Sequence, residues 1–145
     1  MYTIQQVVGE NLLLNYEVIR NELQKALEYS DGDRNAAQII LDSISNPQIY
    51  QIWGVYKDSN RVALGSTRVV KYAGFRALHI ITLAGETDGD LCEWAAIFEK
   101  EMEEQPIDML EITGRRGFVK QLKEAGWTER YTTMRKSIKE IPNGE

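Results

Sequence analysis

The residues most suited to chemistry lie where an apolar run meets a glycine-containing loop and an amphipathic helix. Residues 78–83 are almost all apolar, which predicts a strand covered on both faces. Gly85 and Gly89 lie in the loop that follows. A helix that begins after such a loop directs unpaired N–H groups at an anion. This layout therefore offers a binding site for a phosphate or a diphosphate.

The same loop carries three acids, Glu86, Asp88 and Asp90, and no basic residue. A helix N-terminus favours a nearby anion by roughly 0.3–1 kcal/mol. One carboxylate a few ångströms from a phosphate opposes it by about 1–4 kcal/mol at surface-like dielectric. Three carboxylates outweigh the dipole unless they point away or a cation lies between. Their simpler role is to cap the helix, so we expect a poor diphosphate site.

Two further side chains could move protons. Glu111 interrupts the apolar strand at residues 107–113. It could be a general base that accepts a proton from an amine, and an ion pair with a nearby arginine is the simpler interpretation. His79, the only histidine, lies in the run 78–83. It fits a hydrogen-bonded core residue better than a base.

The elements that must position these groups follow from the spacing of apolar residues. The pattern predicts an α/β (α+β) fold, in which helices cover both faces of a mixed, mostly antiparallel central sheet. The expected order of elements is β-α-α-β-β-β-α-β-α-β. One domain is expected over residues 1–139, followed by a frayed tail at 140–145. Strands are expected at residues 2–8, 48–57, 61–72, 78–83, 107–113 and 127–139, and helices at 12–29, 34–44, 91–102 and 118–125.

Composition excludes several classes of function. The 145 residues carry a net charge of −5, which argues against a nucleic-acid or anionic-membrane partner. One cysteine, Cys92, excludes an internal disulfide framework and a cysteine-rich zinc site, and we expect no metal. A single histidine without a nucleophile motif excludes a Ser-His-Asp set. The chain has no leader pattern and no apolar run of ~18 residues, so we expect a cytoplasmic protein.

The order of elements resembles the GCN5-related N-acetyltransferases, the GNAT superfamily, over nearly the whole chain. The stretch VALGSTRVV, with Gly65 after a short apolar run, resembles the family's third strand. The stretch LKEAGWTERYTTMRKSI resembles the family's ending, in which a helix closes at a Gly-aromatic pair, here Gly126-Trp127. The stretch LEITGRRGFVKQLKEAGW is most similar to short GNAT-like proteins encoded by bacteriophages.

The resemblance implies that acetyl-CoA or another acyl-CoA binds where the fourth and fifth strands separate. Its pantetheine would pair with the backbone near Thr82, Leu83 and Ala84. Its pyrophosphate would lie on the loop that contains Gly85 and Gly89.

This sequence departs from the family pattern at three chemical positions. The loop lacks the family's Gln/Arg-x-x-Gly-x-Gly/Ala sequence. Leu122 stands where a tyrosine normally protonates the leaving thiolate, and Tyr131 is the nearest phenol that could replace it. An asparagine that is common after the fifth strand is absent from the turn at residues 114–116.

We therefore expect a phage-encoded GNAT-like protein with a degenerate CoA loop and no general-acid tyrosine. It would act through an unknown protein partner, in assembly or host interaction, in the host cytoplasm or the virion. A homo-oligomer is also compatible with the sequence. The alternative is an active acyl-CoA-dependent N-acyltransferase that acetylates an amine of a small molecule or protein, with Glu111 as base. A third reading is a module that binds a small ligand in the same space.

Overall fold

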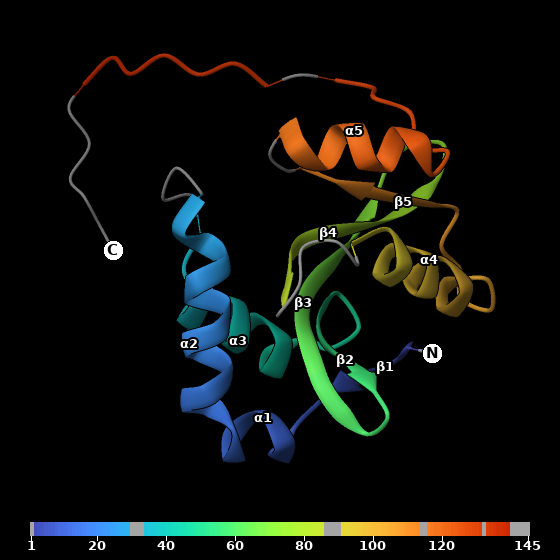
Figure 1. Cartoon of the computed structure of the whole chain (residues 1–145). Coiled ribbons are helices and arrows are strands. Elements are labelled where there is room, and N and C mark those ends of the chain that lie inside the picture. The colour runs from blue at the N-terminus through green and yellow to red at the C-terminus, as the bar shows by residue number, and fades with distance from the viewer. Residues whose placement is uncertain (1, 30–33, 86–90, 114–115, 132, 140–145) are drawn as a thin grey trace.

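A five-stranded sheet in the order β1-β2-β3-β4-β5 forms the centre of the molecule (Figure 1). The computed structural model describes residues 2–29, 34–85, 91–113, 116–131 and 133–139. The strands from β1 to β4 pair antiparallel, and β4 and β5 pair parallel. The strands are β1 (Tyr2–Val7), β2 (Tyr50–Lys57), β3 (Asn60–Lys71), β4 (Arg76–Gly85) and β5 (Met109–Ile112).

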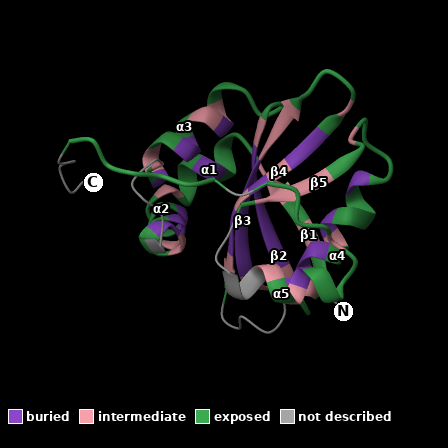
Figure 2. Cartoon of the chain, turned by 90° about the horizontal axis from the view of Figure 1, so that it is seen from above, coloured by how far each residue is buried: buried purple, intermediate pink, exposed green. Residues whose placement is uncertain are grey.

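Helices cover both faces of the sheet, and each face has its own apolar core (Figure 2). Helices α1, α2 and α3 pack on the face that carries Ile52 and Leu64. Helices α4 and α5 pack on the face that carries Trp53 and Leu78. The helices are α1 (Glu10–Leu14), α2 (Tyr16–Ala26), α3 (Ala36–Ser45), α4 (Leu91–Met102) and α5 (Arg116–Glu124), with a short 3-10 turn at Leu27–Tyr29.

The predicted fold class is confirmed. The first predicted helix is divided at Asn15 into α1 and α2, and the helix predicted from residue 34 begins at Ala36. It begins there because the side chain of Asn35 accepts a hydrogen bond from the backbone N–H of Gln38 at 2.8 Å. Within the described residues, every helix is too short or too polar to span a membrane.

The predicted last strand, residues 127–139, is wrong for this single chain. The described residues of this stretch, 127–131 and 133–139, form no strand. The segment begins close to α5, because the Trp127 N–H donates to the Leu122 carbonyl at 2.9 Å. It then leads away from β5 toward the side where α2 lies, in both views (Figures 1 and 2). A strand needs a neighbouring strand, and strand propensity alone does not supply one.

Candidate active site

Strand β4 and the edge strand β5 part halfway along β4. Strands β4 and β5 pair at four positions, from Ala77↔Met109 to Ile80↔Ile112. Strand β4 continues to Gly85, paired with β3 on its other side. Within the described residues, the β5-facing edge of residues 81–85 therefore has no strand partner. Backbone N–H and C=O groups on such an edge can bind an extended ligand as a further strand would.

An irregularity in β4 lies at the same point. Thr82 lies opposite Ser66 on β3, and Ile80 lies opposite Thr67, so Ile81 has no opposite residue. An extra residue of this kind bends a strand and redirects its side chains. The bend therefore coincides with the place where β4 leaves β5.

A carboxylate, an imidazole and a phenol meet beside this point. The Tyr72 hydroxyl donates a hydrogen bond of 2.8 Å to Glu111 Oε1. The same oxygen lies 3.0 Å from His79 Nδ1. His79 and Glu111 are directly paired across β4 and β5, and Tyr72 directly follows β3. We call these three residues the Glu111 cluster.

An ionised Glu111 assigns the roles of the two imidazole nitrogens. An ionised carboxylate can only accept hydrogen bonds, so His79 Nδ1 must carry the proton that lies between it and Glu111. In the neutral ring, His79 Nε2 is then an acceptor. The side chains of His79 and Glu111 are 17% and 33% exposed. The cluster therefore contains a partly exposed imidazole whose Nδ1 faces a carboxylate.

The phenol of Tyr72 is held in its protonated form. The hydrogen bond to Glu111 is the largest cause that raises its pKa above 10.0, followed by burial and the charge of Glu111. The nearby charge of Arg68 lowers the pKa of Tyr72, and Tyr131 raises it. Arg68 lies opposite His79 on β3, and its buried Nε has no hydrogen-bond partner in the described part of the chain.

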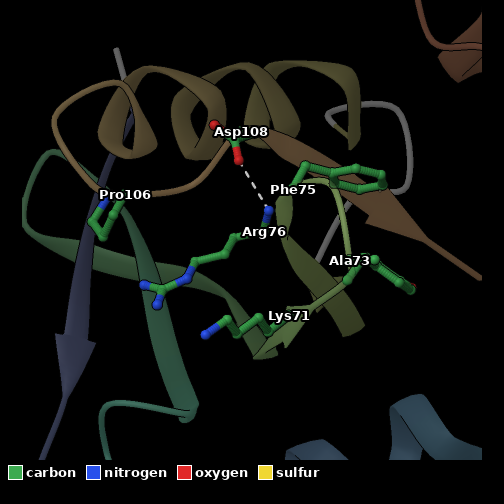
Figure 3. A pocket seen from close by; sticks show the side chains of 7 residues that line it. Lys71, Ala73, Phe75, Arg76, Pro106 and Asp108 are labelled. Carbon is green, nitrogen blue, oxygen red and sulfur yellow. Dashed lines mark hydrogen bonds between the residues drawn. The ribbon is translucent and has the colours of Figure 1, made fainter.

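A surface hollow of about 340 Å³ adjoins the cluster through Tyr72 (Figure 3). Lys71 and Arg76 lie opposite each other on β3 and β4, and both side chains extend the same way in the figure. Asp108 Oδ2 accepts a hydrogen bond from the Arg76 backbone N–H at 2.9 Å. The Asp108 N–H donates to the Arg76 carbonyl at the same distance. These two bonds hold the start of β5 against β4.

The structure places the predicted cofactor residues at the free edge of β4 as far as it describes them. Thr82 and Leu83 are buried, Ala84 is half-buried and Gly85 ends the strand. The Thr82 hydroxyl lies 2.6 Å from that of Ser66. Gly89 and the acids Glu86, Asp88 and Asp90 lie outside the described residues, so the effect of these acids on a diphosphate stays a prediction.

The two residues predicted as catalytic, Glu111 and Tyr131, differ in their surroundings. Glu111 contacts Tyr72 and His79, whereas the Tyr131 side chain is 94% exposed. Leu122 is buried in the core beneath α5. Sequence reasoning missed Tyr72, because no spacing rule connects it to Glu111, 39 residues later. Among the described residues, no three His, Cys, Asp or Glu side chains gather as metal ligands would.

No family model matches the sequence, and no curated protein matches it. Solved structures, in contrast, match over nearly the full length. An aminoglycoside acetyltransferase from an uncultured soil metagenomic sample, in complex with sisomicin, has a TM-score of 0.64 and 13% identity, with 95% of this chain and 97% of that chain covered.

Two further structures match equally well. A predicted acetyltransferase with acetyl-CoA from Clostridium acetobutylicum has a TM-score of 0.65 and 11% identity, with 95% and 97% of the two chains covered. A GNAT family acetyltransferase from Staphylococcus aureus has a TM-score of 0.62 and 12% identity, with 94% and 98% covered. At this level of identity the likeness establishes the fold, which is that of the GNAT acetyltransferases.

Proposed function

We propose that this chain, which has the GNAT acetyltransferase fold, transfers an acyl group from acyl-CoA to an amine, with His79 accepting the amine proton. One observation carries the proposal. The His79–Glu111 pair lies one position before the last paired residues of β4 and β5, next to the free edge of β4. A proton acceptor and a strand edge that can bind an extended ligand are thus adjacent.

The free edge fits the pantetheine arm of acyl-CoA. Thr82, Leu83 and Ala84 would hold it through backbone N–H and C=O groups, because the side chains of Thr82 and Leu83 are buried. When bound, acetyl-CoA supplies an acyl group activated as a thioester. The residues of the chain have to exclude water, position the amine and accept its proton.

His79 Nε2 is suited to that last task. An ammonium cannot attack a carbonyl carbon, so its proton must pass to a base. Glu111 orients the imidazole through Nδ1 and stabilises the positive charge that forms on it, as a carboxylate does in a Ser-His-Asp triad. Tyr72 donates to the same carboxylate and holds it in place. Like an ordinary tyrosine, this phenol is protonated at neutral pH and can donate, and the bond to Glu111 raises its pKa further.

Buried Leu122 offers no proton to the leaving group. A thiol has an ordinary pKa near 8.5, so a thiolate is a far better leaving group than an alkoxide. A general acid adds typically about 100- to 10,000-fold. With a leucine at this position we therefore expect a lower rate of acyl transfer, but not the loss of the reaction. The acceptor would be an amine of a small molecule or of a protein.

Calorimetry and kinetics test this function. We expect acetyl-CoA to bind saturably, with a dissociation constant on the order of 1 μM to 1 mM. His79→Gln and Glu111→Gln should lower the rate of CoA release, measured with aminoglycoside, amino-sugar and peptide amines, by about 100-fold or more. Glu17→Gln removes an exposed carboxylate of α2 and should leave the rate unchanged. Equal rates in all four proteins would exclude His79 as the base.

A second candidate function is a protein of the same fold that has lost catalysis and acts by protein–protein contacts, in the assembly of a bacteriophage or its interaction with a host. The burial of Leu122 at the tyrosine position favours it, as do the exposed apolar side chains of Tyr131, Met134 and Ile138. It predicts no saturable heat with acetyl-CoA. The same calorimetric titration therefore separates the two candidates.

A further inference from the structure

A second hollow, of about 220 Å³, lies between the sheet and the pair of helices α1 and α2. Ile19 of α2 and Leu64 of β3 form part of its lining, and both belong to the apolar core on this face. Leu64 precedes Arg68, the residue opposite His79, by four positions on β3. At about 3.3 Å per residue this separation is roughly 13 Å. The hollow is therefore separate from the Glu111 cluster.

The ring of Tyr56 lines this hollow and lies over a glycine of its own strand. A Cβ atom at Gly54 would be 2.7 Å from the Tyr56 hydroxyl oxygen and 2.8 and 2.9 Å from two of its ring carbons. Because these three neighbouring atoms are almost equally distant, the ring lies against the strand and does not extend into solvent. So close an approach is possible only where the strand has no side chain. Gly54 thus allows an aromatic ring to rest at the hollow.

Three side-chain amides and a guanidinium surround the same space. They belong to Gln5 of β1, Asn11 of α1, Asn15 between α1 and α2, and Arg61 of β3. The Asn15 amide nitrogen donates to the Asn11 carbonyl at 2.9 Å, which leaves the Asn15 side-chain oxygen as an acceptor. In the part of the chain that the structure describes, no protein group bonds the side-chain amides of Gln5 and Asn11 or the Tyr56 hydroxyl. These groups offer a ligand both donors and acceptors.

The hollow carries little net charge. Arg61 Nη1 donates to Glu22 Oε2 at 2.7 Å, so the guanidinium is paired with a carboxylate and still has further N–H donors. Among the described residues, no other charged side chain lines the hollow. An anion or a cation would therefore gain little from electrostatic attraction at this position. A neutral ligand with several hydroxyl groups suits the lining better.

The volume limits the size of the ligand. Sites for drug-sized molecules measure about 300–1,000 Å³, so this smaller hollow suits a single ring. A sugar ring has hydroxyl groups along its edge and C–H groups on its faces, which match the amides and the aromatic ring respectively. We propose that this hollow binds one neutral sugar ring, with a face of the sugar on Tyr56 and its hydroxyl groups on the surrounding amides and Arg61.

An NMR titration of the full chain tests the site. Glucose, galactose and mannose are added in turn to the ¹⁵N-labelled protein, with adenosine as an aromatic ring of another class. At least one sugar should saturably shift the side-chain amide signals of Gln5 and Asn11, with a dissociation constant on the order of 1 mM for so few ligand atoms. The proposal is overturned if no sugar shifts these signals, or if adenosine binds there more tightly than every sugar.

Variants place the sugar in the hollow. Tyr56→Ala and Asn11→Ala each remove a contact and should weaken binding about fivefold or more. Tyr131→Ala and Asn21→Ala change exposed residues of the same types outside the hollow and should leave the affinity unchanged. Asn11 is itself exposed, so its variant keeps the test valid if Tyr56→Ala does not fold.

His79→Gln separates this site from the proposed active site. This variant should bind the sugar as the wild-type protein does, because His79 does not line the hollow. Loss of sugar binding in His79→Gln would contradict the proposal, as would wild-type affinity in Asn11→Ala. No readout uses acetyl-CoA or measures acyl transfer, so the two proposals can fail independently.

Discussion

Glu111 shows how a single residue acquires its role from its neighbours. One oxygen of its carboxylate, Oε1, accepts from Tyr72 and lies 3.0 Å from His79 Nδ1, so this oxygen orients the imidazole. The sequence suggested a base or an ion pair with an arginine. In the structure this carboxylate oxygen faces a histidine, which is why we propose His79 as the base.

The titration of Tyr72 tests this arrangement. The hydrogen bond to Glu111 raises the pKa of Tyr72 in the folded state above the 10.0 of an ordinary tyrosine. The bond therefore adds stability that is fully present below pH 10 and is lost as the pH rises through the folded-state pKa. NMR of ring-labelled tyrosine should show one residue, absent in Tyr72→Phe, that titrates above 10.

Glu111→Gln is the matching control for that titration. The amide keeps an acceptor oxygen and removes the negative charge, so the pKa of Tyr72 should fall toward 10. A Tyr72 resonance with the same midpoint in both proteins would contradict the assignment of Glu111 as the cause.

The elements meet closely where β3 passes beneath α4. Gly65 lies on β3, and a Cβ atom there would be 3.2 Å from Leu83 Cδ1, 3.3 Å from the Thr82 carbonyl oxygen and 3.5 Å from Phe98. The absence of a side chain thus allows α4 to approach the sheet. The neighbouring strand β4 is the one that carries the free edge, so this contact also sets the position of the candidate site.

Gly65→Ala should therefore destabilise the protein. The methyl group meets a backbone oxygen that cannot rotate away, and overpacking of this kind costs about 1–3 kcal/mol. Urea unfolding followed by circular dichroism measures the loss. Gly74→Ala is the matched control, because nothing lies within 4 Å of a Cβ atom at that position. Equal midpoints for the two variants would show that the contact is not tight.

The whole molecule is a sheet with a separate apolar core on each face, and α4 closes one of them. Phe98 is fully buried between α4 and the sheet. Its ring meets Trp53 edge to face, with the centroids 5.6 Å apart and the planes at 84°. An edge-to-face pair adds stability beyond the area that it buries. The core beneath α4 and α5 thus depends on residues from two distant parts of the chain.

Phe98→Ala should cost about 3–5 kcal/mol, a large part of the stability of a typical domain. Thermal unfolding by differential scanning calorimetry measures the effect. Leu41→Ala removes a side chain that is 54% exposed on α3 and should change the stability by about 0.5 kcal/mol or less. Similar losses for the two variants would mean that Phe98 does not anchor the core.

The sequence by itself determined the fold class, because apolar spacing is a local property. Leu91, Trp94 and Phe98 mark the buried face of a helix by steps of three and four, and the apolar run at residues 78–83 marks a buried strand. Gly126, which directly follows the helix predicted to end at residue 125, has a φ of 96°, as a glycine that caps a helix C-terminus does. Such features depend on neighbours within a few positions.

Only the tertiary structure decided which residues form the candidate site and whether residues 127–139 form a strand. Tyr72 and His79 reach Glu111 from 39 and 32 residues away through strand register, and register is set by the packing of the whole sheet. Residues 127–139 have the composition of a strand, but a strand forms only where another edge accepts its hydrogen bonds. Neither of two distant segments by itself shows whether they will pair. This pairing decides both the candidate site and the conformation of residues 127–139.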